Sequence, residues 1–200
     1  MDMTKDISQL ISKLSPTELV DRQLRRPEVK AKIEQIRAQM NYRVDPWGMD
    51  PEWAARVYAL SLYLYEDYFR VETRGIENIP QGRCMLISNH SGQIPIDGLL
   101  IGVSTVRELD PPRVVRGMVE RLAAKVPFVN TLFARTGMVT GDPTNCENLL
   151  ERGQLIMVFP EGVKGSGKTM KKAYQLQKFG TGFLRIAIRT KTPIVPVSVV

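Results

Sequence analysis

Histidine and cysteine are scarce in this chain of 200 residues, which has one histidine, His90, and two cysteines, Cys84 and Cys146. Two cysteines are too few for a disulfide framework or a four-thiolate zinc site, and they fit a reducing compartment. A single histidine excludes metal sites built from several histidines, so we expect no bound metal. Any imidazole chemistry must use His90.

Long apolar runs are also missing. The sequence has no uncharged apolar stretch of about 18 residues or more, so no segment is predicted to span a bilayer as a conventional helix. Residues 1–10 carry Asp2, Lys5 and Asp6 and lack the apolar centre of a secretory signal. We expect a cytoplasmic location, at the cytoplasmic face of a membrane, with peripheral or monotopic attachment.

Acidic residues are absent from the segment 163–191, although the chain as a whole has 21 of them. This segment holds eight basic residues, namely Lys164, Lys168, Lys171, Lys172, Lys178, Arg185, Arg189 and Lys191. The net charge of +7 belongs to this segment, because elsewhere 20 basic residues face 21 acidic ones. A solvated helix face is the ordinary explanation of such a stretch. The alternative is an anionic partner, and we expect an anionic membrane surface rather than nucleic acid, since no nucleic-acid-binding pattern is visible.

The first 69 residues are predicted to form a helical N-terminal region, with helices at 27–42 and 51–69 joined by a linker at 44–50. The second helix contains the nearly unbroken apolar stretch 57–65 with three tyrosines. Such a stretch is typical of a core helix, but an interfacial, membrane-associating helix is also consistent with it.

From residue 70 onward, short β-type runs alternate with helical stretches. The predicted strands are 70–74, 84–88, 114–119, 138–140, 155–159 and 194–200, and the predicted helices are 97–109, 120–133, 143–152 and 183–190. This alternation predicts an α/β domain over 70–200, with a mixed central sheet flanked by helices. The last strand runs to the end of the chain, which is typical of a domain truncated at its C-terminus.

The first candidate site follows the buried strand 84–88. His90 lies just beyond its carboxyl end, where open α/β sheets place their sites, and Asp97 begins the next helix. A carboxylate that holds one imidazole N–H leaves the other nitrogen to take a proton from an alcohol. The alternative is a lone histidine and a helix-capping aspartate. Gly92 lies in the intervening turn and could let the chain fold back.

Two further patterns follow, FPEG at 159–162 and IVPV at 194–197. Together with His90 and Asp97, in this order, they resemble the glycerolipid acyltransferase family (PlsC-like lysophospholipid acyltransferases) over about residues 76–200. The resemblance implies transfer of an acyl group from acyl-CoA or acyl carrier protein to a hydroxyl of a lysophospholipid, glycerol-phosphate or related lipid alcohol. It implies no bound cofactor.

The resemblance also assigns roles to residues. It implies His90 as general base and Asp97 as its partner, Glu161, Gly162, Lys164 and Arg135 at the acceptor phosphate, and backbone N–H groups near Gly92 or Gly162 at the oxyanion. The chain departs from the family pattern in three places. In the family's second block, Arg135 precedes the glycine, and residues 140–142 stand where a basic residue is usual. Six residues separate His90 from Asp97 where four are usual, so either the longer loop closes the pair or another group orients the histidine. After FPEG, Lys164 and Gly165 stand where arginine and serine are usual, which leaves the acceptor open.

A different function is suggested by residues 162–169, which match the phosphate-binding P-loop pattern at every position. This alternative would make the chain an NTP-binding protein. Against it, Glu161 would place a carboxylate beside the phosphates, and few residues follow for the rest of a nucleotide-binding fold. A non-enzymatic binder of anionic lipid or nucleic acid is the third alternative.

Overall fold

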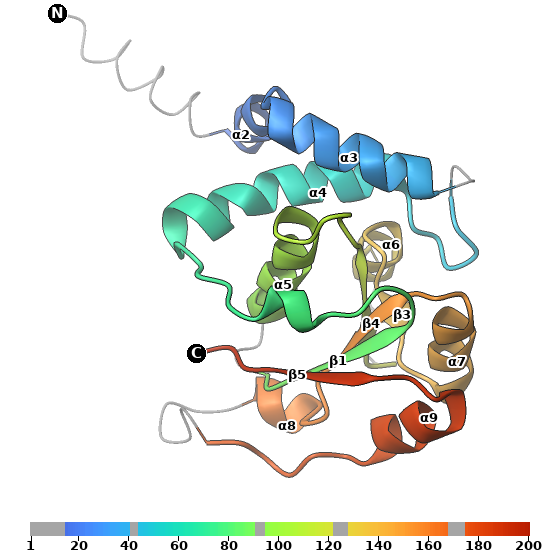
Figure 1. Cartoon of the computed structure of the whole chain (residues 1–200). Coiled ribbons are helices and arrows are strands. Elements are labelled where there is room, and N and C mark those ends of the chain that lie inside the picture. Colours follow the sequence, from blue (N-terminus) through green and yellow to red (C-terminus); the bar gives the residue numbers. More distant parts are fainter. Residues whose placement is uncertain (1–14, 41–43, 91–94, 122–127, 168–174) are drawn as a thin grey trace, which may run out of the picture.

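A five-stranded parallel β-sheet with helices on both faces forms the centre of the protein (Figure 1). The computed structural model describes residues 15–40, 44–90, 95–121, 128–167 and 175–200. The strands are β1 (Cys84–Ser88), β2 (Val115–Val119), β3 (Val139–Thr140), β4 (Leu155–Val158) and β5 (Ile194–Val197). They are arranged in the order β3-β2-β4-β1-β5.

The α/β prediction is confirmed, but every pairing between these strands is parallel, whereas the sequence predicts a mixed sheet. The connections explain the difference. A helical segment lies between each strand and the next along the chain, and such crossovers return the chain in the same direction. The predicted strand at 70–74 is wrong, because these residues have no regular structure and pair with no described strand.

The helices form layers on the two faces of the sheet. They are α2 (Pro16–Leu24), α3 (Pro27–Gln39), α4 (Pro51–Tyr63), α5 (Ile96–Arg107), α6 (Val129–Arg135), α7 (Pro143–Glu151), α8 (Val163–Ser166) and α9 (Gly182–Thr190). Short helical turns also occur at Leu64–Tyr68 and Ile76–Asn78. Helices α7 and α9 pack on one face through Leu149, Leu150 and Ile186, and α5 packs on the other through Ile101.

Helices α2, α3 and α4 lie outside α5 and form a further layer (Figure 1). Helix α4 packs between α5 and the two preceding helices, with Ala59 and Leu62 fully buried. The core-helix interpretation of 57–65 is therefore confirmed. Helix α2 was missed by the sequence analysis, although Ser15 before Pro16 is a capping signal, and its hydroxyl accepts the N–H of Glu18 at 3.2 Å.

The segment 44–50 is more than a linker. Asp45 is buried and pairs with the guanidinium of Arg116 in β2. Trp47 lies beside this pair and donates its indole N–H to Asn145 of α7 at 3.2 Å. These contacts fix the connection between α3 and α4 to the sheet and to the helix on its other face. The predicted helix at 120–133 is confirmed only in its last part, because α6 begins at Val129 and residues 120, 121 and 128 are not helical. Residues 122–127 lie outside the described part.

Candidate active site

His90 and Asp97 meet at the carboxyl end of β1. The Nδ1 atom of His90 lies 2.7 Å from Oδ2 of Asp97, whose side chain is 4% exposed. The other oxygen of Asp97 accepts the N–H of Gly98 at 2.8 Å, which fixes the carboxylate in the first turn of α5. The pair therefore closes across the longer spacing. Gly92, the expected oxyanion support, lies outside the described residues.

The imidazole ring of His90 is held in place by packing. It stacks on Phe159, with ring centroids 4.3 Å apart and an interplanar angle of 29°. Gly98 of α5 lies close to the Phe159 ring, and a Cβ atom there would lie 3.4 Å from that ring, at the short end of ordinary contact. A Cβ atom on Gly165 would lie 2.7 Å from Cβ of Glu161 and 3.1 Å from Cβ of His90. Glycine at 165, where the resemblance expects serine, is thus required by this packing.

Glu161 contacts the backbone on two sides. Its side chain is buried, and Oε1 accepts the N–H of His90 at 3.1 Å, while Oε2 accepts the N–H of Gln177 at 2.8 Å. The sequence analysis expects this residue at an acceptor phosphate. The structure shows the carboxylate of Glu161 linking the backbone at His90 to the basic segment 163–191. No sequence signal reveals this role.

A cavity of about 420 Å³ opens in front of His90. Gly162 lines it, with a backbone φ of +56° that favours glycine, and its N–H is donated to the carbonyl of Phe159 at 3.0 Å. That N–H is therefore not an oxyanion donor in this conformation. Lys164 follows on α8 and is exposed.

Arg135 belongs to a neighbouring cavity of about 470 Å³. Its guanidinium lies 5.5 Å from the centre of the Trp53 ring. The two cavities share Val119, Phe133 and Met138 as lining residues. The structure thus brings His90, Asp97, Glu161 and Gly162 together. Arg135 lies in the neighbouring cavity, which is separated from them by the shared lining residues.

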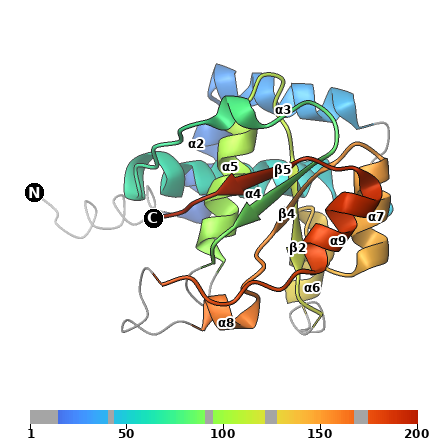
Figure 2. The same ribbon diagram turned by 60° about the horizontal axis from the view of Figure 1, so that its bottom comes forward.

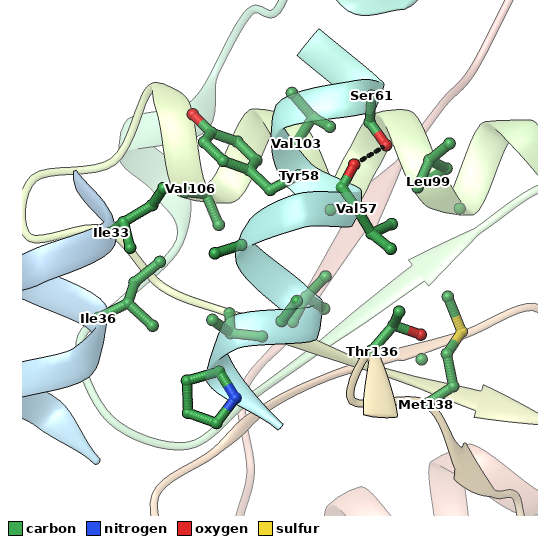
Figure 3. Close-up of a pocket in the computed structure, with 18 of the residues that line it drawn as sticks. Ile33, Ile36, Val57, Tyr58, Ser61, Leu99, Val103, Val106, Thr136 and Met138 are labelled. Carbon is green, nitrogen blue, oxygen red and sulfur yellow. Dashed lines mark hydrogen bonds between the residues drawn. The ribbon is translucent and has the colours of Figure 1, made fainter. Parts of the chain in front are cut away.

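A third cavity, of about 110 Å³, lies between α3, α4, α5 and β2 and is almost entirely apolar (Figure 3). It shares four lining residues with the His90 cavity, Gly98, Gly117, Met138 and Met157. Tyr58 lines its other end, and burial raises the pKa of that phenol to about 12. Apolar cavities of roughly this size stay dry and accept apolar guests. This cavity was not predicted from the sequence. The glycines that line it, Gly98, Gly102 and Gly117, are the sequence feature that could have indicated it.

The described residues contain no group of three or more histidine, cysteine or acidic side chains that could hold a metal ion. Both cysteines are buried. Burial raises the pKa of the Cys146 thiol to about 11 and also raises that of Cys84, so both thiols are protonated at neutral pH. Neither thiol is prepared for nucleophilic attack.

The sequence model of the acyltransferase family matches residues 70–200. The chain belongs to the acyltransferase family. This match confirms the resemblance on which the His90–Asp97 assignment rests. The match covers β1 to β5, so the strands beside the candidate site all lie inside it.

Comparison with curated proteins gives the relatives of this acyltransferase. An uncharacterized protein of Mycobacterium tuberculosis (strain H37Rv) is 38% identical over 163 residues, which is 80% of this chain and 46% of the relative. A "DGAT1/2-independent enzyme synthesizing storage lipids" of Mus musculus is 29% identical over 128 residues, 62% of this chain and 37% of the relative. A 1-acyl-sn-glycerol-3-phosphate acyltransferase of Pseudomonas aeruginosa is 24% identical over 182 residues, 84% of this chain and 61% of the relative.

The chain spans less than half the length of the mycobacterial relative. No solved structure was found to match it. None of the helices in the described ranges combines the length and apolarity needed to cross a membrane.

The P-loop alternative is not favoured by the described part of residues 162–169. Gly162 and Gly165 donate their N–H groups to the carbonyls of Phe159 and Gly162, at 3.0 and 2.9 Å, so neither is available to a phosphate. Lys168 and Thr169 of that pattern lie outside the described residues.

Proposed function

We propose that this acyltransferase moves a fatty acyl group from acyl-CoA or acyl carrier protein to a hydroxyl of a lysophospholipid, glycerol-phosphate or related lipid alcohol, in glycerolipid synthesis. The observation that carries the proposal is the 2.7 Å contact between His90 Nδ1 and Asp97 Oδ2 beside a cavity of about 420 Å³. The relatives named for 1-acylglycerol-3-phosphate acylation and for storage-lipid synthesis support a lipid acceptor.

The reaction proceeds by direct transfer. Asp97 holds the Nδ1–H tautomer of His90, so Nε2 takes the proton as the acceptor oxygen attacks the thioester carbonyl. The tetrahedral intermediate collapses with cleavage of the C–S bond, and the imidazolium returns its proton to the departing thiolate. The products are an ester and a free thiol. No acyl-enzyme is formed, which agrees with the buried, protonated thiols of Cys84 and Cys146.

The apolar cavity is suited to the end of the donor's acyl chain. It adjoins the His90 cavity through Gly98, Gly117, Met138 and Met157, so a chain whose carbonyl lies at His90 can pass between these residues. A Cβ atom on Gly117 would lie 2.8 Å from Sδ of Met138, so a larger residue at this point of β2 would require the Met138 side chain to move. Ile33 and Ile36 of α3 line the cavity together with Tyr58 of α4 (Figure 3). An acyl chain that fills the cavity would therefore end against N-terminal helices.

Among the residues that the structure describes, few basic side chains lie on the acceptor side. Arg135 lies in the neighbouring cavity, Glu161 is used by the backbone, and Lys164 is exposed on α8. This arrangement supports neutral lipid alcohols such as diacylglycerol as candidate acceptors, in addition to acceptors that bear a phosphate.

The test is a transfer screen with acyl-CoA and acyl carrier protein donors against lysophospholipids, glycerol 3-phosphate and diacylglycerol, with the His90→Ala protein as the blank. We expect release of free thiol matched by formation of the ester with at least one acceptor. Thioester hydrolysis alone, or no difference from the blank across the panel, would contradict the proposal.

Filling the apolar cavity should shorten the preferred acyl chain. Gly102 lines it, and a Cβ atom there would lie 3.7 Å from Val115, an ordinary contact, so Gly102→Val is expected to fold normally and occupy the space. We expect kcat/KM for long-chain acyl-CoA to fall about tenfold relative to short-chain acyl-CoA, because about 1.4 kcal/mol of apolar burial is lost. Gly102→Ala should give a smaller shift in the same direction. An unchanged chain-length profile in a folded Gly102→Val protein would place the acyl chain elsewhere.

A further inference from the structure

Helix α9 exposes an apolar stripe. Leu184 and Ile188 are 45% and 70% exposed, and their spacing of four residues puts them on the same face. The side of the helix that faces the core carries Ile186 and Ala187, which are buried. Leu176, in the segment just before α9, is 67% exposed. Three large aliphatic side chains thus face solvent within one short stretch of chain.

Basic side chains accompany this stripe. Lys178, Arg185, Arg189 and Lys191 are all exposed, and the segment 163–191 contains no acid. Among the residues that the structure describes, Arg189 pairs with Glu147 of α7, and no ion pair is formed by the other three. An exposed aliphatic stripe bordered by unpaired cations is typical of a helix that lies in the interface of an anionic bilayer.

The same segment is bonded to the candidate active site. The N–H of Gln177 binds Glu161 at 2.8 Å, and Glu161 in turn binds the N–H of His90. The N–H of Gly180 binds the carbonyl of Pro160 at 2.8 Å. Figures 1 and 2 both show this segment passing along one side of the molecule, from the side of α8 to α9. A partner that contacts residues 175–191 would therefore lie close to Glu161, which binds the backbone of His90.

We propose that Leu176, Leu184 and Ile188, with Lys178, Arg185 and Lys191, form the surface by which this acyltransferase rests on an anionic lipid bilayer. The proposal rests on the proposed function, because a bilayer held at this surface would supply the lipid acceptor close to His90. The exposed apolar residues favour a bilayer over nucleic acid, because they are aliphatic and offer no stacking to bases. The stretch 57–65 offers a smaller exposed apolar surface, because Ala59, Leu62 and Tyr65 are buried against the neighbouring helices and Leu60 is its one exposed large apolar residue, at 37%.

The experiment measures flotation of the whole chain with vesicles of phosphatidylcholine containing phosphatidylglycerol, and with vesicles of phosphatidylcholine alone. One variant carries Leu184→Ser and Ile188→Ser, and a second carries Lys178→Gln, Arg185→Gln and Lys191→Gln. The matched control carries Arg22→Gln, Arg25→Gln and Lys30→Gln, which removes the same charge from exposed positions on α2 and α3 and between them. We expect each surface variant to bind anionic vesicles at least about tenfold more weakly, and the control to bind as the parent does.

Unchanged vesicle binding by both surface variants would overturn the proposal, as would an equal loss in the control. So would binding to DNA or to an acidic protein without binding to anionic vesicles. Transfer to a water-soluble short-chain acceptor is the second readout, and the surface variants should retain it. If the parent protein transfers no acyl group to any acceptor yet loses vesicle binding in the variants, the proposed function fails and the docking surface stands.

Discussion

His90→Ala is expected to lower the rate of acyl transfer by about 10²–10⁴-fold, the contribution of a positioned general base. Without the imidazole, no other base described at the end of β1 is expected to take the proton from the acceptor hydroxyl, because the carboxylates of Asp97 and Glu161 are bonded to backbone N–H groups. The free energy of unfolding should fall by about 1–3 kcal/mol, because loss of the ring uncovers Phe159 and removes one hydrogen bond from the buried carboxylate of Asp97. The measurement is the initial rate of thiol release from acyl-CoA with the best acceptor, together with urea unfolding of both proteins.

The partner of the histidine provides an internal comparison. Asp97→Asn keeps an oxygen near Nδ1 but removes the charge that stabilises the imidazolium, so its rate should lie between those of the parent and His90→Ala. Asp67→Asn, at an exposed position, is the matched control and should leave the rate unchanged. A His90→Ala protein that folds and retains its activity would falsify the catalytic assignment. Parental activity in Asp97→Asn would show that the contact of 2.7 Å has no part in the reaction.

The main features of the α/β unit could be predicted from local sequence. The run 84–88 is apolar throughout and is followed by turn residues, and it is observed as β1 with the same bounds. Asp142 before Pro143 marks the start of α7, and its carboxylate accepts the N–H of Asn145 at 3.0 Å as expected of a helix cap. Signals of this kind depend on residues that are neighbours in the sequence, so they can be recognised without knowledge of the fold. The parallel order of the strands is a property of distant pairings, and the sequence analysis correspondingly erred by predicting a mixed sheet.

The same division applies to the site. Residue types and their position at a strand end were enough to select His90 and Asp97, but whether six intervening residues allow contact depends on the path of the loop. The contacts of Glu161 could not be foreseen, because its two N–H donors lie 71 and 16 residues away in the sequence. The close approach of α8 at Gly165 is only partly local, since a Cβ atom there would lie 2.7 Å from Cβ of Glu161, four residues earlier, and 3.1 Å from Cβ of His90, which is distant in the sequence.

Asp45→Ala is expected to destabilise the protein by about 3–5 kcal/mol, the cost of leaving a buried charge without its partner. Asp45 and Arg116 have side chains that are 0% and 3% exposed, and they are paired. The other carboxylate oxygen accepts the N–H groups of Trp47 and Met49, at 2.9 and 2.8 Å. The mutation therefore leaves a guanidinium in the core and two backbone donors without an acceptor. Urea unfolding should show a lower midpoint with little change in the slope.

Asp50→Ala is the matched control, since it removes an aspartate from the same segment that only caps α4, and about 1 kcal/mol is expected there. An Asp45→Ala protein no less stable than Asp50→Ala would contradict the assigned role of the pair. Replacing both partners, Asp45→Leu with Arg116→Met, should recover much of the loss, because a buried ion pair can be exchanged for apolar packing. The pair also fixes the connection between α3 and α4, which line the apolar cavity, so Asp45→Ala should broaden the acyl-chain preference in the direction opposite to Gly102→Val.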